Sequence, residues 1–329
     1  MRAGPVAAVV FAAGRGTRMR SSVPKVLHEV AGEPLLTHVL RAVGEVAPER
    51  CVVVIGHGAD LVRDRFGDAG VEFALQSEQL GTGHALRTAG AALGAWSGTT
   101  LVVNGDDVLL EGAPLGRLLE AHDAGGSGMT MLTYELRDPT GLGRVVRAGD
   151  GSVARIVEER DGDETVRALR EINPGVYAFD EHVWEMLGRL DAGNAASEYY
   201  LTDVIAAYVA RGLSVRAVRG DGDGTAPVGV NDRAQLAQAE RIVHERVRAR
   251  WLEAGVTMHD PATTYVASSV ELARDVILEV GVVLRGATTV GEGAVVGAYA
   301  VLEDCAVGAG CHVVPHSVAH GARFDESGA

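Results

Sequence analysis

The feature that most constrains the fold is a six-residue repeat in the last part of the chain. Apolar residues recur at every sixth position, at Val266, Leu272, Leu278, Leu284, Val290, Val296 and Leu302. The repeat then slips by one residue and resumes at Val307 and Val313, with glycine and other small residues between. A short fixed period of this kind predicts a parallel β-helix, in which each short strand stacks on the next coil.

The residues before this repeat follow a different pattern, in which apolar runs alternate with amphipathic segments. The strand-like runs are Val6–Phe11, Cys51–Ile55, Leu101–Asn104 and Met129–Tyr134. Helical patterns include Leu35, Leu36, Val39, Leu40 and Val43, then His84–Leu93, Glu181–Leu190 and Thr202–Arg211. Asp150-Gly151 indicates a hairpin turn within Arg144–Val157. The alternation predicts an α/β fold with a mostly parallel, Rossmann-like sheet, whose ligands bind at the carboxyl ends of the strands.

These patterns divide the chain into three parts. Residues 1–231 form the expected α/β domain, and residues 232–254 form a connecting helix rich in Ala, Arg, Glu and Gln. Residues 255–329 form a short β-helix.

Composition limits the kinds of partner that the chain can bind. The net charge of −14 makes it a poor ligand for nucleic acid or an anionic membrane. Phosphates must therefore be bound locally, by a few cations, backbone N–H groups and a metal ion. The three cysteines form no C-x-x-C pair, and the N-terminus has no secretory pattern, so we expect a cytoplasmic protein.

A glycine loop follows the first strand-like run and is a candidate phosphate site. Gly14 and Gly16 let the backbone wrap closely round a phosphate, and Arg15, Arg18 and Lys25 add positive charge nearby. Met19 stands where a dinucleotide fingerprint needs glycine, and a G-x-x-x-x-G-K-[ST] loop is absent. A simple tight turn is the alternative interpretation of the loop.

Longer motifs narrow this interpretation. The run Ala12-Ala13-Gly14-Arg15-Gly16-Thr17-Arg18-Met19, continued by Pro24-Lys25, resembles the signature of sugar nucleotidyltransferases. Further segments are Gly56-His57-Gly58, Gln76, Gln79–Ala85, Gly105-Asp106, Asp138–Arg144, Ile156–Glu158, Glu171–Asn173, Glu198–Asp203 and Gly229–Asn231. In this order they resemble the uridylyltransferase half of the bifunctional N-acetylglucosamine-1-phosphate uridylyltransferase/glucosamine-1-phosphate acetyltransferase family. The resemblance covers nearly the whole chain.

The resemblance implies a reaction, a left-handed β-helix and a set of site residues. The reaction converts N-acetylglucosamine 1-phosphate and UTP to UDP-N-acetylglucosamine, a peptidoglycan precursor, and pyrophosphate. The implied nucleotide-binding residues are Ala12, Ala13, Gly14, Lys25, Gln76, Gly81 and Thr82. The implied sugar-binding residues are Gly105, Gly143, Glu158, Asn173 and Asn231. Arg18 and Lys25 are the implied catalytic cations, and Asp106 and Asn231 the implied Mg²⁺ ligands.

Each of these residues has a structural alternative. Asp106 is also suited to a turn, and Asn231 to the N-cap of the helix that follows it. Lys25 is also suited to a solvated surface, and Glu158 to an exposed hairpin edge.

Four positions depart from the family pattern. Asp107-Val108 replaces the usual residue and proline after the metal aspartate, and Asn104 precedes the Gly-Asp pair. Pro174 follows Asn173, and Val228 stands where an acidic residue is usual. These departures leave open another sugar 1-phosphate or nucleotide, of the UDP-glucose or dTDP-glucose type. They also leave open a catalytically degenerate regulatory paralogue.

The number of coils is smaller than the resemblance implies for the complete family. We therefore expect the acetyltransferase site, which the later coils carry, to be absent, as in a truncated or naturally short relative. β-helices of this family form homotrimers, and with so few coils trimer formation stays open.

Overall fold

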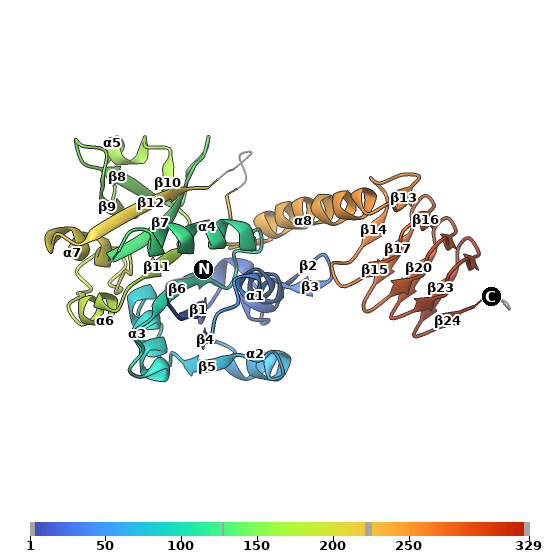
Figure 1. Cartoon of the computed structure of the whole chain (residues 1–329), viewed down its shortest axis with the longest axis horizontal. Coiled ribbons are helices and arrows are strands. Elements are labelled where there is room, and N and C mark those ends of the chain that lie inside the picture. Colours follow the sequence, from blue (N-terminus) through green and yellow to red (C-terminus); the bar gives the residue numbers. More distant parts are fainter. Residues whose placement is uncertain (1–3, 127, 221–225, 326–329) are drawn as a thin grey trace. The chain divides into compact units, whose positions relative to one another are not determined.

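The computed structural model describes residues 4–126, 128–220 and 226–325, which fall into two compact units (Figure 1). The first unit comprises Met1–His28 and Leu35–Asp232, and the second comprises Glu29–Pro34 and Arg233–Ala329. The expected boundaries place residues 29–34 in the first domain, whereas the structure groups them with the second unit. The reason is hydrogen bonding to residues far along the chain: the Ala31 amide donates to Glu240 over 2.8 Å, and the Ala31 carbonyl accepts from Ser268 over 2.8 Å.

The first unit is an α/β domain around one large sheet. Its strands are β1 (Val6–Ala12), β4 (Arg50–Ile55), β5 (Glu72–Leu75), β6 (Thr99–Asn104), β7 (Gly128–Glu135), β8 (Gly143–Arg147), β9 (Val153–Val157), β10 (Glu171–Asn173), β11 (Tyr177–Phe179) and β12 (Ser214–Arg219). Its helices are the 3-10 turns η1 (Thr17–Met19) and η2 (Lys25–Leu27), then α1 (Leu35–Glu45), α2 (Ala59–Phe66), α3 (Thr82–Leu93), α4 (Gly112–Asp123), α5 (Glu164–Arg167), α6 (His182–Leu187) and α7 (Asp203–Ala210).

The sheet is parallel in one half and mixed in the other. Its strand order is β5-β4-β1-β6-β11-β7-β10-β8-β9, and β12 pairs with β7. The strands β5, β4, β1 and β6 are parallel to one another, whereas β11 runs antiparallel to both β6 and β7. The expected Asp150-Gly151 turn is confirmed, because β8 and β9 pair as an antiparallel hairpin around it.

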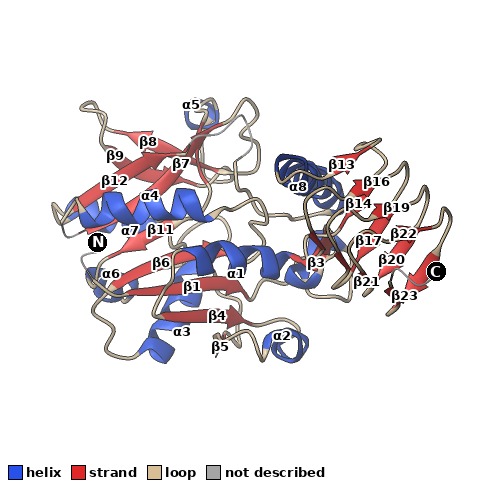
Figure 2. Cartoon of the chain, turned by 45° about the vertical axis from the view of Figure 1, so that its right-hand side comes forward, coloured by secondary structure: helices blue, strands red, loops and turns tan. Residues whose placement is uncertain are grey.

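Both faces of the sheet are covered by helices, as the alternation of buried residues requires (Figure 2). In β1, Ala8 and Val10 point to the cluster that contains residues of α1 and α4. The intervening residues Ala7 and Val9 point to the cluster that contains residues of α3 and α7. All four side chains are fully buried, which explains why this strand is apolar throughout.

The second unit is the predicted left-handed parallel β-helix. It contains the hairpin strands β2 (Glu29–Val30) and β3 (Glu33–Pro34) and the long helix α8 (Arg233–Glu253). The coil strands are β13 (Thr257–Met258), β14 (Tyr265–Val266), β15 (Glu271–Leu272), β16 (Ile277–Leu278), β17 (Val283–Arg285), β18 (Thr289–Val290), β19 (Val295–Val296), β20 (Val301–Glu303), β21 (Ala306–Val307), β22 (His312–Val313), β23 (Val318–His320) and β24 (Arg323–Phe324). They form three parallel sheets of four strands each, and every apolar residue of the six-residue repeat is buried.

The one-residue slip in the repeat is a shortened corner between β20 and β21. Asp304 occupies this corner in the left-handed backbone region, with a φ of 53°. Its carboxylate accepts a hydrogen bond from the Ala287 amide of the coil below, over 2.8 Å. The side-chain oxygen of Asp304 thus satisfies a backbone donor at the place where the coil is one residue shorter.

No helix within the described ranges has the length and apolar character needed to cross a lipid bilayer.

Candidate functional site

Three predicted site residues from distant segments meet at one point of the first unit. The Lys25 ammonium forms a short ion pair with the Asp106 carboxylate and also donates to the amide oxygen of Asn231 over 3.2 Å. The side chains of Lys25 and Asp106 are only 16% and 10% exposed. This burial contradicts the alternative that Lys25 is a solvated surface charge.

The parallel sheet explains why these residues meet. Because Phe11 of β1 pairs with Asn104 of β6, the glycine loop and the Gly105-Asp106 turn leave the sheet side by side. The Gly105 amide donates to the Phe11 carbonyl over 2.8 Å, and the Val230 amide donates to the Asp106 carbonyl over 3.1 Å. The second bond brings Asn231 beside the carboxylate.

Glycine is required at two positions around this cluster. A Cβ on Gly229 would overlap the Asp106 carboxylate, and a Cβ on Gly16 would come within 2.8 Å of the Lys25 Cβ. Gly16 also has a left-handed φ of 57°. The two glycines therefore leave the space that the charged side chains occupy.

The glycine loop itself has the properties of an anion site. Among the described residues, the backbone N–H groups of Gly14 and Arg15 donate to no protein acceptor. A Cβ on Gly14 would meet no atom within 4 Å, so packing within the protein does not explain glycine there. Free amides at an open surface beside a lysine suit a phosphate.

The two predicted cations of this loop differ in their contacts. Arg15 donates to Gln79 over 3.3 Å, which joins the loop to the segment after β5. Arg18 is exposed on η1 and, among the described residues, makes no hydrogen bond or ion pair. The structure does not bring Arg18 into contact with the Lys25 cluster.

The oxygens of Asp106 and Asn231 fit the proposed metal ion. Both accept hydrogen bonds from the same Lys25 ammonium, so they converge on the position of a single cation. One carboxylate and one amide oxygen are hard ligands of the kind that Mg²⁺ binds while it keeps several waters.

A second group of predicted residues lies at the start of α3. Gln76 is buried, and its amide nitrogen lies 3.1 Å from the Gly81 carbonyl and 2.9 Å from His84 Nδ1. Gly81 has a φ of 103°, and a Cβ there would come within 2.7 Å of the Tyr199 carbonyl. Thr82 Oγ1 accepts from the Leu201 amide over 3.0 Å. Buried amide and backbone groups held in this way can match the polar edge of a base.

A third group of predicted residues lies around the β8–β9 hairpin and β10. The amide nitrogen of Asn173 donates to the Tyr177 hydroxyl over 2.6 Å, and its amide oxygen accepts from Gly175. Glu158 is half-buried rather than exposed, and Thr202 donates to it over 3.3 Å. Gly143 lies beside this carboxylate, since a Cβ there would be in ordinary contact with it at 3.4 Å.

Burial perturbs the titration of two groups in this region. Burial, with the neighbouring Asp161 and Asp203 carboxylates, raises the pKa of Glu158 although Thr202 donates to it. Burial also raises the pKa of the Tyr177 hydroxyl, and Glu158 and Asp107 add to this effect. The Tyr177 hydroxyl therefore stays protonated at neutral pH.

Hydrogen bonds connect the three groups. Thr82 and Thr202 join the start of α3 to Glu158 through the segment Leu201-Thr202. Asn104, at the end of β6, joins the Asp106 turn to the segment after Asn173 through the Pro174 carbonyl.

Several residues of the site were not predicted as site residues. They are His84, Asn104, Tyr177 and Thr202. Thr202 and His84 lie within motif segments of the family resemblance, so their positions could have been suspected. Asn104 and Tyr177 are single residues whose contacts depend on strand register.

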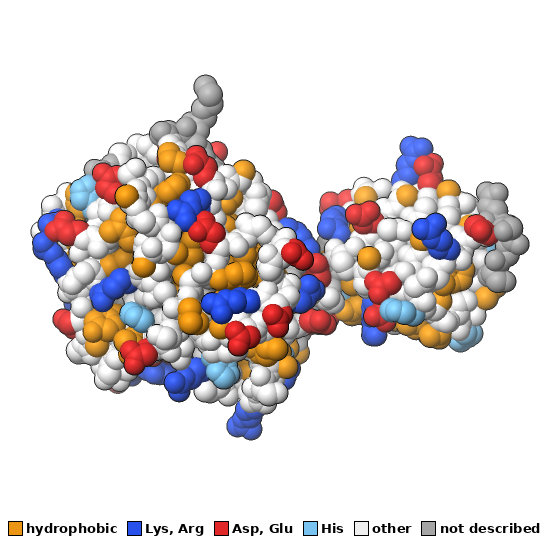
Figure 3. Space-filling model, turned by 90° about the horizontal axis from the view of Figure 1, so that it is seen from below, with side chains coloured by type: hydrophobic (Ala, Val, Ile, Leu, Met, Phe, Trp, Pro, Cys, Tyr) orange, Lys and Arg blue, Asp and Glu red, His pale blue; other side chains and the backbone are white. Residues whose placement is uncertain are grey.

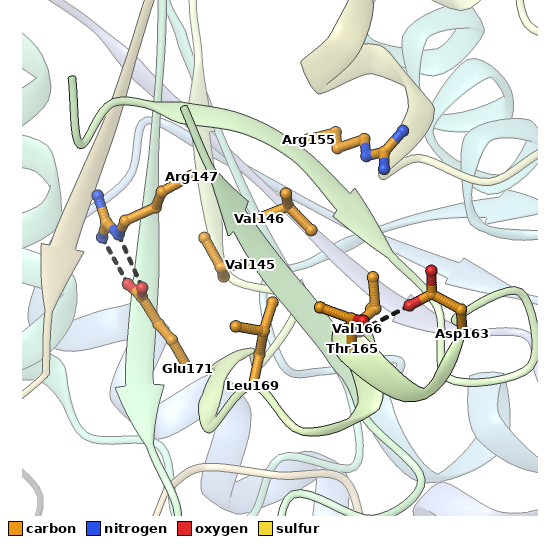
Figure 4. Close-up of a pocket in the computed structure, with 9 residues that line it drawn as sticks. All are labelled: Val145, Val146, Arg147, Arg155, Asp163, Thr165, Val166, Leu169 and Glu171. Atoms are coloured by element: carbon orange, nitrogen blue, oxygen red, sulfur yellow. Dashed lines mark hydrogen bonds and ion pairs between the residues drawn. The ribbon is translucent and has the colours of Figure 1, made fainter. Parts of the chain in front are cut away.

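A separate hollow of about 500 Å³ lies over β8, β9 and α5 and contains none of the predicted site residues (Figure 4). Val145, Val146, Val166 and Leu169 form its apolar part, and Arg147 pairs with Glu171 at one end. We do not assign the site to it, because its polar side chains do not converge on one point.

The surface drawn in Figure 3 has mixed charge. Lysine and arginine side chains are interspersed with aspartate and glutamate over both units, without a broad basic patch on that face.

Comparisons with known proteins show what this chain is similar to. Residues 8–190 match the MobA-like NTP transferase domain. The chain is 48% identical over 316 residues to the bifunctional protein GlmU of Thermus thermophilus, covering 96% of this chain and 69% of the relative. The GlmU protein of Syntrophotalea carbinolica is 44% identical, with coverages of 98% and 69%. That of Kineococcus radiotolerans is 50% identical, with coverages of 94% and 63%.

Proposed function

We propose, since the chain belongs to the GlmU family, that it converts N-acetylglucosamine 1-phosphate and UTP to UDP-N-acetylglucosamine and pyrophosphate. The observation that carries the proposal is the meeting of Lys25, Asp106 and Asn231 beside a glycine loop with free backbone amides. A cation suits the charged phosphates, and a carboxylate with an amide oxygen suits the metal ion that accompanies a triphosphate.

The reaction is an in-line displacement at phosphorus. A phosphate oxygen of the sugar phosphate attacks the α-phosphorus of UTP and forms a new P–O bond. The bond from the α-phosphorus to the bridging oxygen of the β-phosphate breaks, and pyrophosphate leaves with that electron pair. The nucleophile is already an anion at neutral pH, so positioning and charge neutralisation replace a general base.

Different residues of this chain are proposed to bind the phosphates, the metal ion, the base and the sugar. The Gly14 loop and Lys25 hold the phosphates, and the exposed Arg18 is close enough along the chain to approach the same charge. Asp106 and Asn231 would hold Mg²⁺, which would supply positive charge to neutralise the triphosphate. Gln76, Gly81 and Thr82 recognise the uracil, and Gly105, Gly143, Glu158 and Asn173 recognise the sugar.

A substrate panel tests this proposal. Pyrophosphate release is measured for UTP, dTTP and other nucleotides, each with N-acetylglucosamine 1-phosphate or glucose 1-phosphate. We expect the highest kcat/KM for UTP with N-acetylglucosamine 1-phosphate. No turnover with any pair, and no rise of Tm when UTP and Mg²⁺ are added, would indicate a degenerate paralogue instead.

Matched variants connect the activity to the site. Asp106→Ala should lower turnover by about 10²–10³-fold, the usual range for removal of one group that stabilises transition-state charge. Asp60→Ala is the control, because the Asp60 side chain is 94% exposed on α2. Near-wild-type turnover of Asp106→Ala would remove the metal assignment.

Three further properties belong to the proposal. The domain division is a uridylyltransferase domain, a connecting helix and a β-helix. The β-helix is proposed to form a homotrimer, as the family resemblance suggests. A reducing, cytoplasmic location suits the free cysteines Cys51, Cys305 and Cys311.

A further inference from the structure

Two positions that depart from the family pattern, Asn104 and Pro174, are joined to the buried Asp107 by one side chain. The amide nitrogen of Asn104 donates to the Asp107 carboxylate over 3.2 Å and to the Pro174 carbonyl over 3.1 Å. Asn104, Asp107 and the backbone carbonyl of Pro174 therefore form one hydrogen-bonded unit.

Strand register places this unit between the metal side and the sugar side of the site. Strand β11 pairs antiparallel with β6, with Tyr177 opposite Val102. Continuing the register puts Gly175 level with Asn104. A Cβ on Gly175 would come within 2.5 Å of the Asn104 amide nitrogen, so the turn after Asn173 packs directly against that amide.

The burial of Asp107 makes the Asn104 amide hard to replace. Asp107 is completely buried, and its Oδ1 has no hydrogen-bond partner among the described residues. Its other oxygen accepts from the Asn104 side chain. A buried carboxylate that loses its side-chain donor is strongly unfavourable, so the Asn104 amide is held in one orientation.

We propose that Asn104 is a positioning residue for the sugar phosphate. Its amide fixes the turn that follows Asn173 against the buried carboxylate beside Asp106. It thereby sets the position of the Asn173 side chain relative to the metal ligands, and this inference rests on the proposed function.

The orientation of Asn173 depends on that turn. Its amide oxygen accepts from the Gly175 amide over 3.1 Å, and its amide nitrogen donates to Tyr177. Moving the turn therefore moves the sugar-binding amide. The Gln76 and Thr82 group has no hydrogen bond to Asn104, Asp107 or Pro174, so recognition of the uracil of UTP should not respond.

The experiment separates the two substrates. KM for the sugar 1-phosphate and KM for UTP are measured in the full chain for wild type, Asn104→Ala and Asn104→Ser. We expect Asn104→Ala to raise KM for the sugar phosphate about tenfold, the loss for one or two buried hydrogen bonds, with KM for UTP within about twofold of wild type. Asn104→Ser keeps a hydroxyl donor and should fall between wild type and Asn104→Ala.

Thr130→Val is the matched control. Thr130 is a buried residue of β7 that makes a hydrogen bond to His122 over 3.2 Å, and it pairs with Ala178 rather than with the Asn173 turn. The substitution Thr130→Val removes this buried hydrogen bond. It should lower Tm without changing the ratio of KM for the sugar phosphate to KM for UTP.

The outcomes distinguish the inference from the proposed function. Equal changes in both KM values, or a change in the ratio with Thr130→Val as well, would overturn the positioning role. So would an Asn104→Ala chain that does not fold while Asn104→Ser keeps both KM values at the wild-type level. Absence of turnover in the wild type for all substrate pairs would instead overturn the proposed function.

Discussion

Gly229 offers a test of the metal site that leaves every proposed ligand in place. Its backbone is not in the left-handed region, so alanine fits the local conformation. The added Cβ would overlap Asp106 Oδ2 and lie 2.9 Å from Asp106 Cγ. Ordinary contact begins near 3.4 Å, so the carboxylate must retreat by about 0.5 Å or more.

The cost of this displacement can be estimated. Overpacking a rigid site typically costs about 1–3 kcal/mol. If that energy is lost from metal binding, the apparent Mg²⁺ affinity falls by about 5- to 150-fold, because about 1.4 kcal/mol corresponds to a factor of ten. Initial rates are measured against Mg²⁺ concentration with both substrates saturating. Gly229→Ala should need correspondingly more Mg²⁺ for half-maximal rate.

Gly116→Ala is the control for this experiment. Gly116 lies in α4, and a Cβ there would meet no atom within 4 Å. Alanine in a helix is favoured over glycine by about 1 kcal/mol, so this variant should be slightly more stable and have wild-type Mg²⁺ dependence. The same Mg²⁺ dependence in Gly229→Ala and wild type would refute the role given to Asp106.

Three other variants test the rest of the site. Lys25→Met should lower kcat/KM by about 10²–10³-fold, because a cation on the phosphates is lost, and steady-state rates at saturating Mg²⁺ check this. Tyr177→Phe removes the hydroxyl that accepts from Asn173 and should raise KM for the sugar phosphate, not KM for UTP, about tenfold. Glu158→Gln should lower sugar affinity yet raise Tm at pH 8, because the raised pKa of Glu158 means that its ionised form destabilises the fold. The penalty exists above the folded pKa and disappears below the unfolded value of 4.5, so equal Tm differences at pH 8 and pH 4 would contradict it.

The regular parts of the fold could be predicted because the spacing of apolar residues that marks them is visible within short stretches of sequence. The six-residue repeat fixed which residues of the β-helix are buried, and Val266 and Leu284 are fully buried as expected. The apolar run at Val6–Phe11 likewise became a strand buried on both faces. Each of these predictions needs only the spacing of neighbouring residues.

The assignment of residues 29–34 needed information that the sequence does not carry locally. This segment is hydrogen-bonded to the second unit through Glu240 and Ser268, which lie more than two hundred residues further along the chain. A pattern of neighbours cannot reveal such a pairing.

The candidate site was predictable to different degrees. Lys25, Asp106 and Asn231 lie in motifs and could be named, but their meeting depends on contacts across 81 and 206 residues of sequence. Asn104 and Tyr177 lie in no chemical motif. Their contacts arise from the β6–β11 register, which is set by the packing of the whole sheet.

The most direct test of the account is diffraction from crystals of the full chain grown with Mn²⁺ and UTP. Manganese replaces magnesium at oxygen sites and gives an anomalous signal that locates the ion. The account predicts an anomalous peak bonded to Asp106 and Asn231, with the triphosphate against Lys25 and the Gly14 loop. A nucleotide bound elsewhere, or a manganese peak away from these two oxygens, would contradict it.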